Sequence, residues 1–162
     1  MCKRVFFSVC LLFVLNSCSF IKRIFHKSGS SSYSSAEIKS VIKEAKKMKG
    51  VPYKTGGKDE NGMDCSGLLF RAYAENDFEI PRISADQAKF GEEIKLKDIQ
   101  IGDWVFFATG KIGLINHVGL ITLERPSIRF IHASTTYGVR EDLLYQKFWL
   151  DRIVKIIRPF KN

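Results

Sequence analysis

Three residues of this 162-residue chain could together perform nucleophilic catalysis: Cys65, His117 and His132. A thiol attacks carbonyl carbon as its thiolate, and it needs a nearby base, usually a histidine, to take its proton. Cys65 follows Asp64 at the start of a predicted helix, where unpaired N–H groups and the helix dipole favour the thiolate. We therefore expect a lowered thiol pKa and a cysteine that is nucleophilic at neutral pH.

The two histidines flank a predicted hairpin, whereas the remaining one, His26, lies in a predicted linker. A turn centred between Glu124 and Arg125 would place His117 and His132 directly opposite each other, with Cβ atoms about 5 Å apart. One ring could then act as the base and the other could orient it, as the third member of a catalytic triad does.

Two other interpretations of the same three residues remain open. They could be zinc ligands, although no two are spaced as in structural zinc motifs and no fourth ligand is evident. They could also be structural, because an unaligned Cys/His pattern is a weak signal and a buried histidine is more often part of the core.

The elements that must position these residues can be read from the hydrophobic pattern. Ser34 and Glu37 form a capping box ahead of an apolar helical stripe that Gly50 ends. A second helix is predicted from Cys65 to Glu75, with Asp64 as its N-cap.

The second half of the chain shows strand patterns. Strands are predicted at Trp104–Phe107, Val118–Leu123, Ile128–Ile131 and Val154–Ile157. Helices followed by meandering strands indicate an α+β fold with an antiparallel sheet. We interpret Trp104, Phe106, Phe107 and Trp149 as packing residues and not as a ligand-stacking surface.

The N-terminus resembles an export signal. Lys3 and Arg4 precede the apolar run Val5–Leu15, which is too short to span a bilayer. The sequence Leu15-Asn16-Ser17-Cys18 that follows resembles the lipobox of bacterial lipoproteins, whose cysteine is acylated after cleavage. An ordinary secretory signal with an incidental cysteine is the alternative. Several acyl chains, palmitate among them, on Cys18 would hold the protein on a membrane.

These features divide the chain into a signal peptide at 1–17, a lipid-anchored tether at 18–35 and one domain at 36–162. The tether combines basic and aromatic residues, so it could lie on the bilayer surface or serve as a plain spacer. Cys2 and Cys10 would leave with the signal, and Cys65 then has no disulfide partner. The domain must therefore be held by its core.

Six segments in fitting order resemble the NlpC family of bacterial cell-wall cysteine peptidases. The resemblance runs from about Ala36 to Pro159. The segments are Val51-Pro52-Tyr53-Lys54-Thr55-Gly56-Gly57, Gly62-Met63-Asp64-Cys65-Ser66-Gly67-Leu68, Ile80-Pro81-Arg82-Ile83-Ser84 with Gln87, Gly102-Asp103-Trp104-Val105-Phe106-Phe107, His117-Val118-Gly119-Leu120 and Phe130-Ile131-His132-Ala133-Ser134.

The resemblance implies a papain-like α+β fold, in which the helix of the nucleophile packs on an antiparallel sheet. It implies hydrolysis of peptidoglycan stem peptides, commonly between D-glutamate and a diamino acid, with no cofactor. Matching positions make Cys65 the nucleophile, His117 the base and His132 the residue that orients it. Tyr53 and the Cys65 N–H would stabilise the oxyanion. Recurring pocket positions are matched by Asp64, Ser66, Arg82, Ser84 and Gln87.

For Arg82 two roles stay open: binding a stem carboxylate or forming a structural ion pair. For the whole chain, the alternatives to an endopeptidase are a thiol amidase or acyl transferase with the same site, or a non-catalytic wall-binding lipoprotein. We expect a monomer. Ser19 is compatible with sorting to the outer membrane of a two-membrane bacterium, on the periplasmic face, by analogy with lipoproteins.

The net charge of +9, from 26 Lys and Arg against 17 Asp and Glu, at first suggests a nucleic-acid partner. Residues 18–54 hold nine basic side chains against two acidic ones, whereas residues 55–162 are neutral. An exported protein with this distribution has no reason to bind nucleic acid. The basic part would face anionic lipid or wall polymer, or be a solvated lysine face.

Overall fold

A computed structural model of the chain describes residues 31–124 and 126–161. The predicted signal peptide, Cys18 and residues 19–30 of the predicted tether lie outside the described residues. None of the helices in the described part is long and apolar enough to cross a bilayer.

The two predicted helices are confirmed. Helix α2 spans Ser35–Lys47 and begins with the predicted capping box: the Glu37 N–H donates to Ser34 Oγ at 3.3 Å and the Ser34 N–H donates to Glu37 Oε2 at 2.8 Å. Helix α3 spans Cys65–Ala74, with Asp64 as its N-cap. The capped first turn of each helix satisfies N–H groups that have no partner inside the helix.

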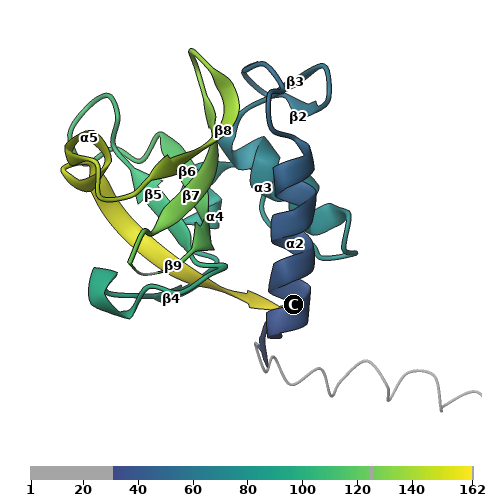
Figure 1. The fold of residues 1–162 in the computed structure, drawn as a ribbon, viewed down its shortest axis with the longest axis horizontal. Helices are drawn as coiled ribbons and strands as arrows, with labels where there is room; N and C mark the ends of the chain where they lie inside the picture. The colour runs from purple at the N-terminus through teal and green to yellow at the C-terminus, as the bar shows by residue number, and fades with distance from the viewer. Residues whose placement is uncertain (1–30, 125, 162) are drawn as a thin grey trace, which may run out of the picture.

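An antiparallel sheet forms the second half of the fold (Figure 1). Its strand order is β1 (Ser31–Ser32), β9 (Ile153–Lys161), β5 (Trp104–Phe107), β6 (His117–Leu123), β7 (Arg129–Ser134) and β8 (Gly138–Leu143), and β4 (Gly91–Glu93) also pairs with β9. Shorter elements complete the described chain: the hairpin β2 (Lys58–Asp59) and β3 (Gly62–Met63), helices α4 (Ser84–Gln87) and α5 (Lys147–Leu150), and a 3₁₀ turn at Leu96–Asp98.

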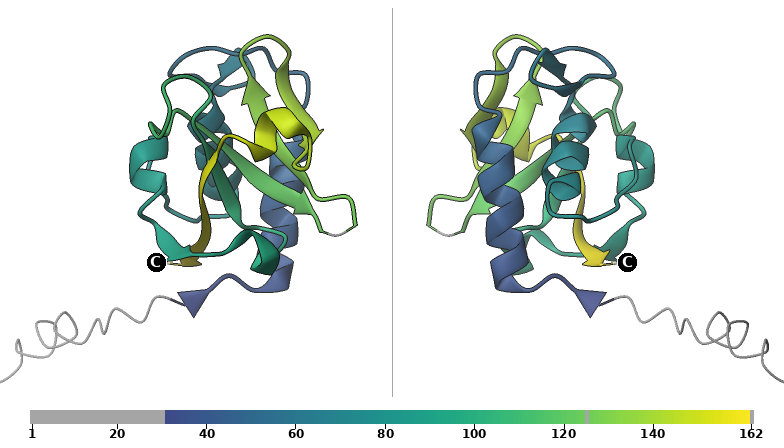
Figure 2. Two further views of the ribbon diagram at one scale, coloured as in Figure 1. Left: turned by 90° about the vertical axis from the view of Figure 1, so that its left-hand side faces the viewer. Right: turned by 90° about the vertical axis from the view of Figure 1, so that its right-hand side faces the viewer.

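The sheet is covered on both faces, which confirms the α+β prediction (Figures 1 and 2). Helices α2 and α3 pack on one face, where Trp104 and Phe106 of β5 are fully buried. The neighbouring residues Val105 and Phe107 are buried on the other face, together with Trp149 of α5. All four residues of β5 are therefore buried, as the continuous apolar run requires.

Two details differ from the sequence prediction. Strand β8 was not anticipated, because Gly138–Leu143 carries three charged residues and lacks an alternating apolar pattern. The β6–β7 register pairs Leu120 with Ile131, which is two residues away from the predicted pairing. The shift arises at the turn, because Leu123 already pairs with Arg129, three residues from its predicted partner. The irregularity between Ile121 and Leu123 then takes back one of these three residues.

The fold also includes residues ahead of the boundary drawn at residue 36. Ser31 and Ser32 pair with Lys161 and Phe160 of β9, and Ser35 is already helical. The N-terminal segment thus enters the domain beside its C-terminal strand.

Glu141 of β8 joins helix α2 to the sheet. Its carboxylate accepts hydrogen bonds from Lys49, from Lys46 at 3.2 Å and from Thr122 Oγ1 of β6 at 2.6 Å. Burial alone would raise the pKa of Glu141, but these donors lower it to about 2. Glu141 is therefore a link between three elements of the fold.

We expect Glu141→Gln to lower the free energy of unfolding by about 1–2 kcal/mol at pH 7, because charge-assisted hydrogen bonds are lost. The depressed pKa means that this stabilisation is present above about pH 4.5 and is lost as the pH falls towards about 2. Urea titrations of both proteins from pH 7 to pH 2 measure the difference.

The matched control is Glu75→Gln, whose pair with Arg71 is 40% exposed on both sides. We expect it to change stability by less than about 0.5 kcal/mol. Equal losses from the two variants at pH 7 would contradict the role assigned to Glu141.

Candidate active site

The nucleophile is held at the first turn of α3 by its neighbours. Asp64 caps the helix, with its Oδ1 atom 2.6 Å from the Gly67 nitrogen. A side chain at position 67 would not fit, because its Cβ would lie 2.1 Å from the Gly57 carbonyl oxygen. The Asp-Cys-Ser-Gly sequence therefore packs the first turn of α3 against the preceding loop, which fixes where Cys65 points.

The Cys65 thiol is 6% exposed, and burial raises its pKa above the ordinary value. The nearby charge of Asp64 also raises the thiol pKa, whereas the N–H groups of Val118 and Ser66 that face the sulfur lower it. The expectation of a lowered thiol pKa is therefore wrong: removal from water outweighs the helix N-terminus. The resting sulfur is a protonated thiol at neutral pH.

His117 is the first residue of β6 and directly precedes Val118, whose N–H faces the sulfur, so the backbone of the histidine lies near the thiol. Its Nε2 atom is 2.9 Å from Nδ1 of His132, which leaves its own Nδ1 atom for the thiol. Burial, and secondly the charge of His132, lower the pKa of His117 to about 3. The ring is thus a neutral base at pH 7.

The two histidines meet diagonally across the strands and not directly opposite each other as predicted. The two-residue register shift moves the partner of each ring along the strand. A shift by an even number of residues keeps side chains on the same face of the sheet. The rings therefore still meet, edge to face, with centroids 5.0 Å apart.

A carboxylate that was not predicted from the sequence is hydrogen-bonded to the second histidine. Nε2 of His132 is 3.1 Å from Oδ2 of Asp142 on β8, and Arg140 binds the other oxygen of Asp142 at 2.7 Å. The hydrogen bond with His132 is the main cause of the lowered pKa of Asp142. The sequence signal available was a carboxylate in the strand beside that of His132, but β8 itself was not predicted.

Trp149 of α5 packs against the histidine pair. Its ring stacks on His117 with centroids 5.7 Å apart, and it meets His132 edge-on at 4.9 Å. Phe130 stacks on His132 with centroids 4.9 Å apart and meets Trp149 edge-on at 5.1 Å. The interpretation of Trp149 as a packing residue is confirmed, and the residues that it packs against are the candidate catalytic base and its histidine partner.

Four of the five predicted pocket residues form one hydrogen-bonded network beside Cys65. Arg82 binds both oxygens of Asp64, at 3.0 and 2.9 Å, and it also donates to Ser66 Oγ and to the Gly57 carbonyl. Burial alone would raise the pKa of Asp64, but Arg82 and the Gly67 N–H hold it below its usual value. In this structure Arg82 is thus engaged in an ion pair, one of its two predicted roles.

Gln87 is fully buried and donates to the carbonyls of Ser66 and Pro81, so it fixes the loop behind the nucleophile. Ser84, the fifth pocket position, begins α4, and no side-chain hydrogen bond joins it to the other site residues in the described chain. Burial raises the pKa of the Tyr53 phenol, and the negative charges that Cys65 and Asp64 carry when ionised raise it further. The Tyr53 hydroxyl therefore stays a proton donor.

No group of three or more His, Cys, Asp or Glu side chains is arranged as metal ligands in residues 31–124 and 126–161. His117 Nε2 and His132 Nδ1 are hydrogen-bonded to each other. This contact places His132 to orient the ring of His117.

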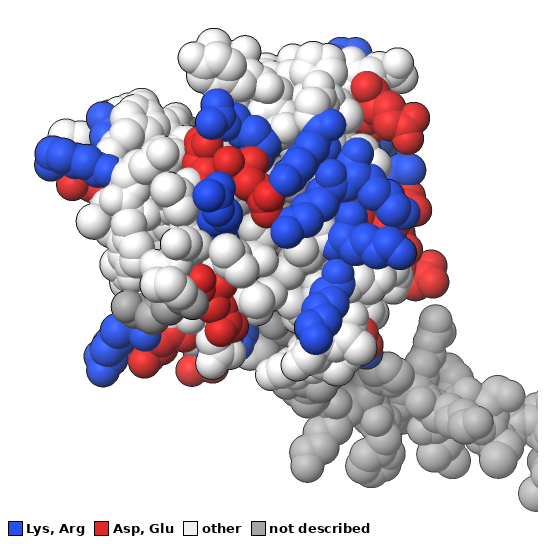
Figure 3. Space-filling view, in the orientation of Figure 1, with Lys and Arg blue, Asp and Glu red and all other residues white. Residues whose placement is uncertain are grey.

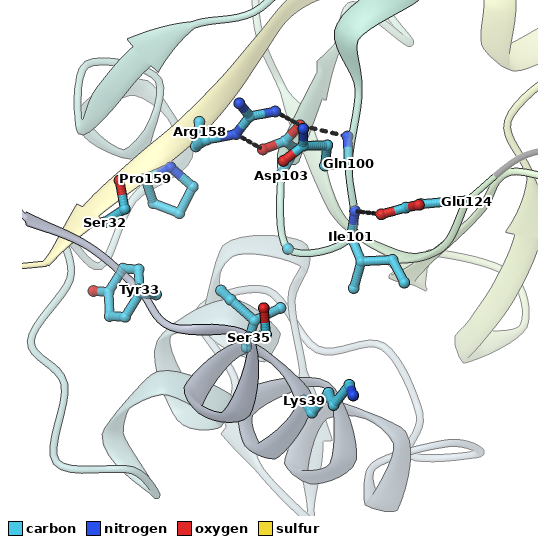
Figure 4. Close-up of a pocket in the computed structure, with 12 residues that line it drawn as sticks. Ser32, Tyr33, Ser35, Lys39, Gln100, Ile101, Asp103, Glu124, Arg158 and Pro159 are labelled. Carbon is cyan, nitrogen blue, oxygen red and sulfur yellow. Dashed lines mark hydrogen bonds and ion pairs between the residues drawn. The ribbon is translucent and has the colours of Figure 1, made fainter.

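A cavity of about 470 Å³ lies elsewhere, between α2 and β9 (Figure 4). Arg158 faces it, but this side chain is bound to Asp103 at 2.9 and 3.0 Å. Glu124 accepts a hydrogen bond from the Ile101 N–H at its rim. No thiol or imidazole lines this cavity, so it does not compete with Cys65 as a candidate catalytic site.

Comparisons of the sequence and the fold with known proteins point to a single family. Residues 50–158 match the model of the NlpC/P60 family. The chain is 34% identical over 105 residues to the Escherichia coli murein DD-endopeptidase MepS/murein LD-carboxypeptidase, which covers 64% of this chain and 53% of that protein. It is 47% identical over 73 residues to the Bacillus subtilis gamma-D-glutamyl-L-lysine dipeptidyl-peptidase, covering 44% of this chain and 24% of the relative.

A solved structure gives the same result. The crystal structure of a lipoprotein-like NLP/P60 family protein from Staphylococcus aureus superposes with a TM-score of 0.70 at 26% identity, over 89% of this chain and 48% of that one. The chain spans 53% to 61% of the length of the first curated relatives that it matches. The family match covers the nucleophile, both histidines and Asp142, and the chain belongs to the NlpC/P60 family.

Proposed function

We propose that the protein is a cysteine endopeptidase that hydrolyses stem peptides of peptidoglycan. The observation that carries this proposal is the Cys65 thiol beside a neutral imidazole whose second nitrogen is already hydrogen-bonded to His132. The activities for which the Escherichia coli and Bacillus subtilis relatives are named support peptidoglycan as the substrate class.

The reaction begins with a neutral pair. His117 takes the thiol proton on Nδ1 as the sulfur attacks the substrate carbonyl, because neither group is charged at rest. The N–H of Cys65 and the hydroxyl of Tyr53 stabilise the oxyanion. His117 then protonates the leaving amine, and water hydrolyses the Cys65 thioester with His117 again as base. No step calls for a cofactor.

The bond we assign is that between D-glutamate and the diamino acid. The Bacillus subtilis relative, whose name states a gamma-D-glutamyl-L-lysine bond, supports this choice. A pure wall-binding role would not use a buried thiol, two linked histidines and a carboxylate in one row. Cleavage between sugar and L-alanine, by an amidase of the same fold, would release different fragments, which mass spectrometry distinguishes.

We further propose that the mature protein is a membrane-anchored lipoprotein acylated at Cys18, on the periplasmic face of an outer membrane. Cys18 and the basic residues of the tether lie outside the described residues. Lys and Arg side chains gather over α2 in the view of Figure 3, which supports an anionic surface nearby. Lys46 and Lys49 of this group are already paired with Glu141.

Cys65→Ala should abolish release of peptide fragments from purified peptidoglycan. The variant keeps the small apolar volume at a 6% exposed position but removes the nucleophile. Fragments from wild type and variant are identified by mass spectrometry, and thermal melting checks that both are folded. Fragments ending in D-glutamate support the proposed bond. Intact wall material in both samples would refute hydrolysis.

The pH profile should report a base with a strongly depressed pKa. Because the pKa of His117 is about 3, the ring stays neutral, and able to accept a proton, through pH 5–7. We expect kcat/KM for a purified stem peptide to show no acid limb with a midpoint near pH 6.5, the usual histidine value. An acid limb at that pH would contradict the assignment of a neutral buried base.

Cys18→Ala should move the protein from the detergent phase to the aqueous phase when cells are extracted with Triton X-114, because the acyl chains are lost. Cys10→Ala is the matched control, since position 10 would leave with the signal. A Cys18→Ala protein that stays in the detergent phase would contradict acylation.

A further inference from the structure

The chain of hydrogen bonds behind Cys65 ends at the carboxylate of Asp142, which side chains from three elements approach. His132 of β7 faces one oxygen of Asp142 at 3.1 Å, and Arg140 of β8 binds the other at 2.7 Å. The Trp149 side chain of α5 lies close enough to this carboxylate to contribute, after His132 and Arg140, to its lowered pKa. His132 is fully buried, and the Asp142 side chain is 12% exposed, so this contact is largely shielded from water.

The carboxylate dictates which nitrogen of each ring carries hydrogen. An ionised Asp142 can only accept, so Nε2 of His132 must carry hydrogen. In a neutral ring Nδ1 of His132 is then an acceptor, and the 2.9 Å contact requires Nε2–H on His117. The remaining Nδ1 of His117 has a free lone pair, which is the form that can take the thiol proton.

We propose that Asp142 is a positioning residue, which sets the tautomers of His132 and His117 so that the base of the site points a lone pair at Cys65. The inference rests on the proposed thiol chemistry of this site. Asp142 comes from β8, a strand outside the predicted hairpin. It acts on the thiol through the two imidazoles and does not touch substrate.

Arg140 makes the effect of one substitution predictable. In Asp142→Asn, Arg140 keeps the amide oxygen on its side, because a guanidinium has only donors. The amide NH₂ group then faces Nε2 of His132 and forces hydrogen onto Nδ1 of that ring. His117 must in turn carry hydrogen on Nδ1, which leaves no lone pair for the thiol. Asp142→Ala lacks the misplaced donor.

A purely structural carboxylate predicts the opposite order. Asn has nearly the shape of Asp and would keep the packing between β8 and α5, whereas Ala would leave a gap beside Trp149. For a structural role the Ala variant is therefore the more damaged one. For a role in setting tautomers the Asn variant is the more damaged one.

The test measures alkylation of Cys65 by iodoacetamide at pH 7 in the full chain, with peptide mass spectrometry to separate it from positions 2, 10 and 18. We expect Asp142→Asn to slow alkylation on the order of 10²-fold, as loss of a general base does, and Asp142→Ala to slow it less. Equal rates in wild type and Asp142→Asn, or a slower rate in Asp142→Ala, would overturn the proposal. Thermal melting shows whether each variant is folded.

A double variant tests the same point without depending on the stability of Asp142→Ala. Arg140→Ala frees the amide introduced at position 142 to rotate, so the double variant Arg140→Ala/Asp142→Asn should recover much of the lost reactivity. Arg140→Ala alone is the reference for the double variant: Arg140 lies opposite His132 on the neighbouring strand, but its side chain is 43% exposed, and an ionised Asp142 can accept from His132 without it. A double variant as slow as Asp142→Asn would overturn the proposed control of tautomers.

The alkylation readout is independent of the peptidoglycan assay. Wild type that releases no wall fragments, together with the expected order of alkylation rates, would refute the hydrolase and leave the role of Asp142 standing. Wild type that cleaves the wall while Asp142→Asn alkylates at the normal rate would refute the role of Asp142 alone.

Discussion

The hydrogen bond between His117 and His132 is the constraint on which the rest of the site depends. It joins β6 to β7 at a contact of 2.9 Å, and such a contact tolerates little movement of either strand. The register of the two strands, the packing of Trp149 on both rings and the position of Asp142 all serve to keep it. The sheet supplies this rigidity because β6 and β7 each have a neighbouring strand on both sides.

The second half of the site is organised around the carboxylate of Asp64. This one side chain caps α3, receives the Gly56 and Gly67 N–H groups and pairs with Arg82, so helix, loop and α4 segment meet at it. A helix cap that is also an ion pair couples the direction of the nucleophile to the loop before it. The candidate site thus consists of two parts: the helix α3, which holds the nucleophile, and the sheet, which holds the histidines.

Much of this arrangement could be predicted from the sequence, and the misses have physical causes. Capping residues and apolar periodicity are local signals, so α2, α3 and β5 were predicted with nearly correct bounds. The predicted β6–β7 register was wrong because the turn is centred later in the chain than predicted, as the pairing of Leu123 with Arg129 shows, and the sequence carries no local signal for this position. Burial of Cys65 comes from tertiary packing, and this reversed the expected direction of the thiol pKa. Asp142 was missed because β8 is rich in charge, and its charges have partners only in the folded chain.

Helix α2 also works as a spacer of fixed length. At its start the chain enters beside β9, and after its end the segment Val51–Tyr53 runs along β8 to the thiol. Thirteen residues at 1.5 Å each make a rod of about 20 Å. The reactive sulfur is therefore held roughly one helix length away from the point where residue 31 joins the domain. The fold itself therefore sets the distance between the N-terminal end of the described chain and the thiol.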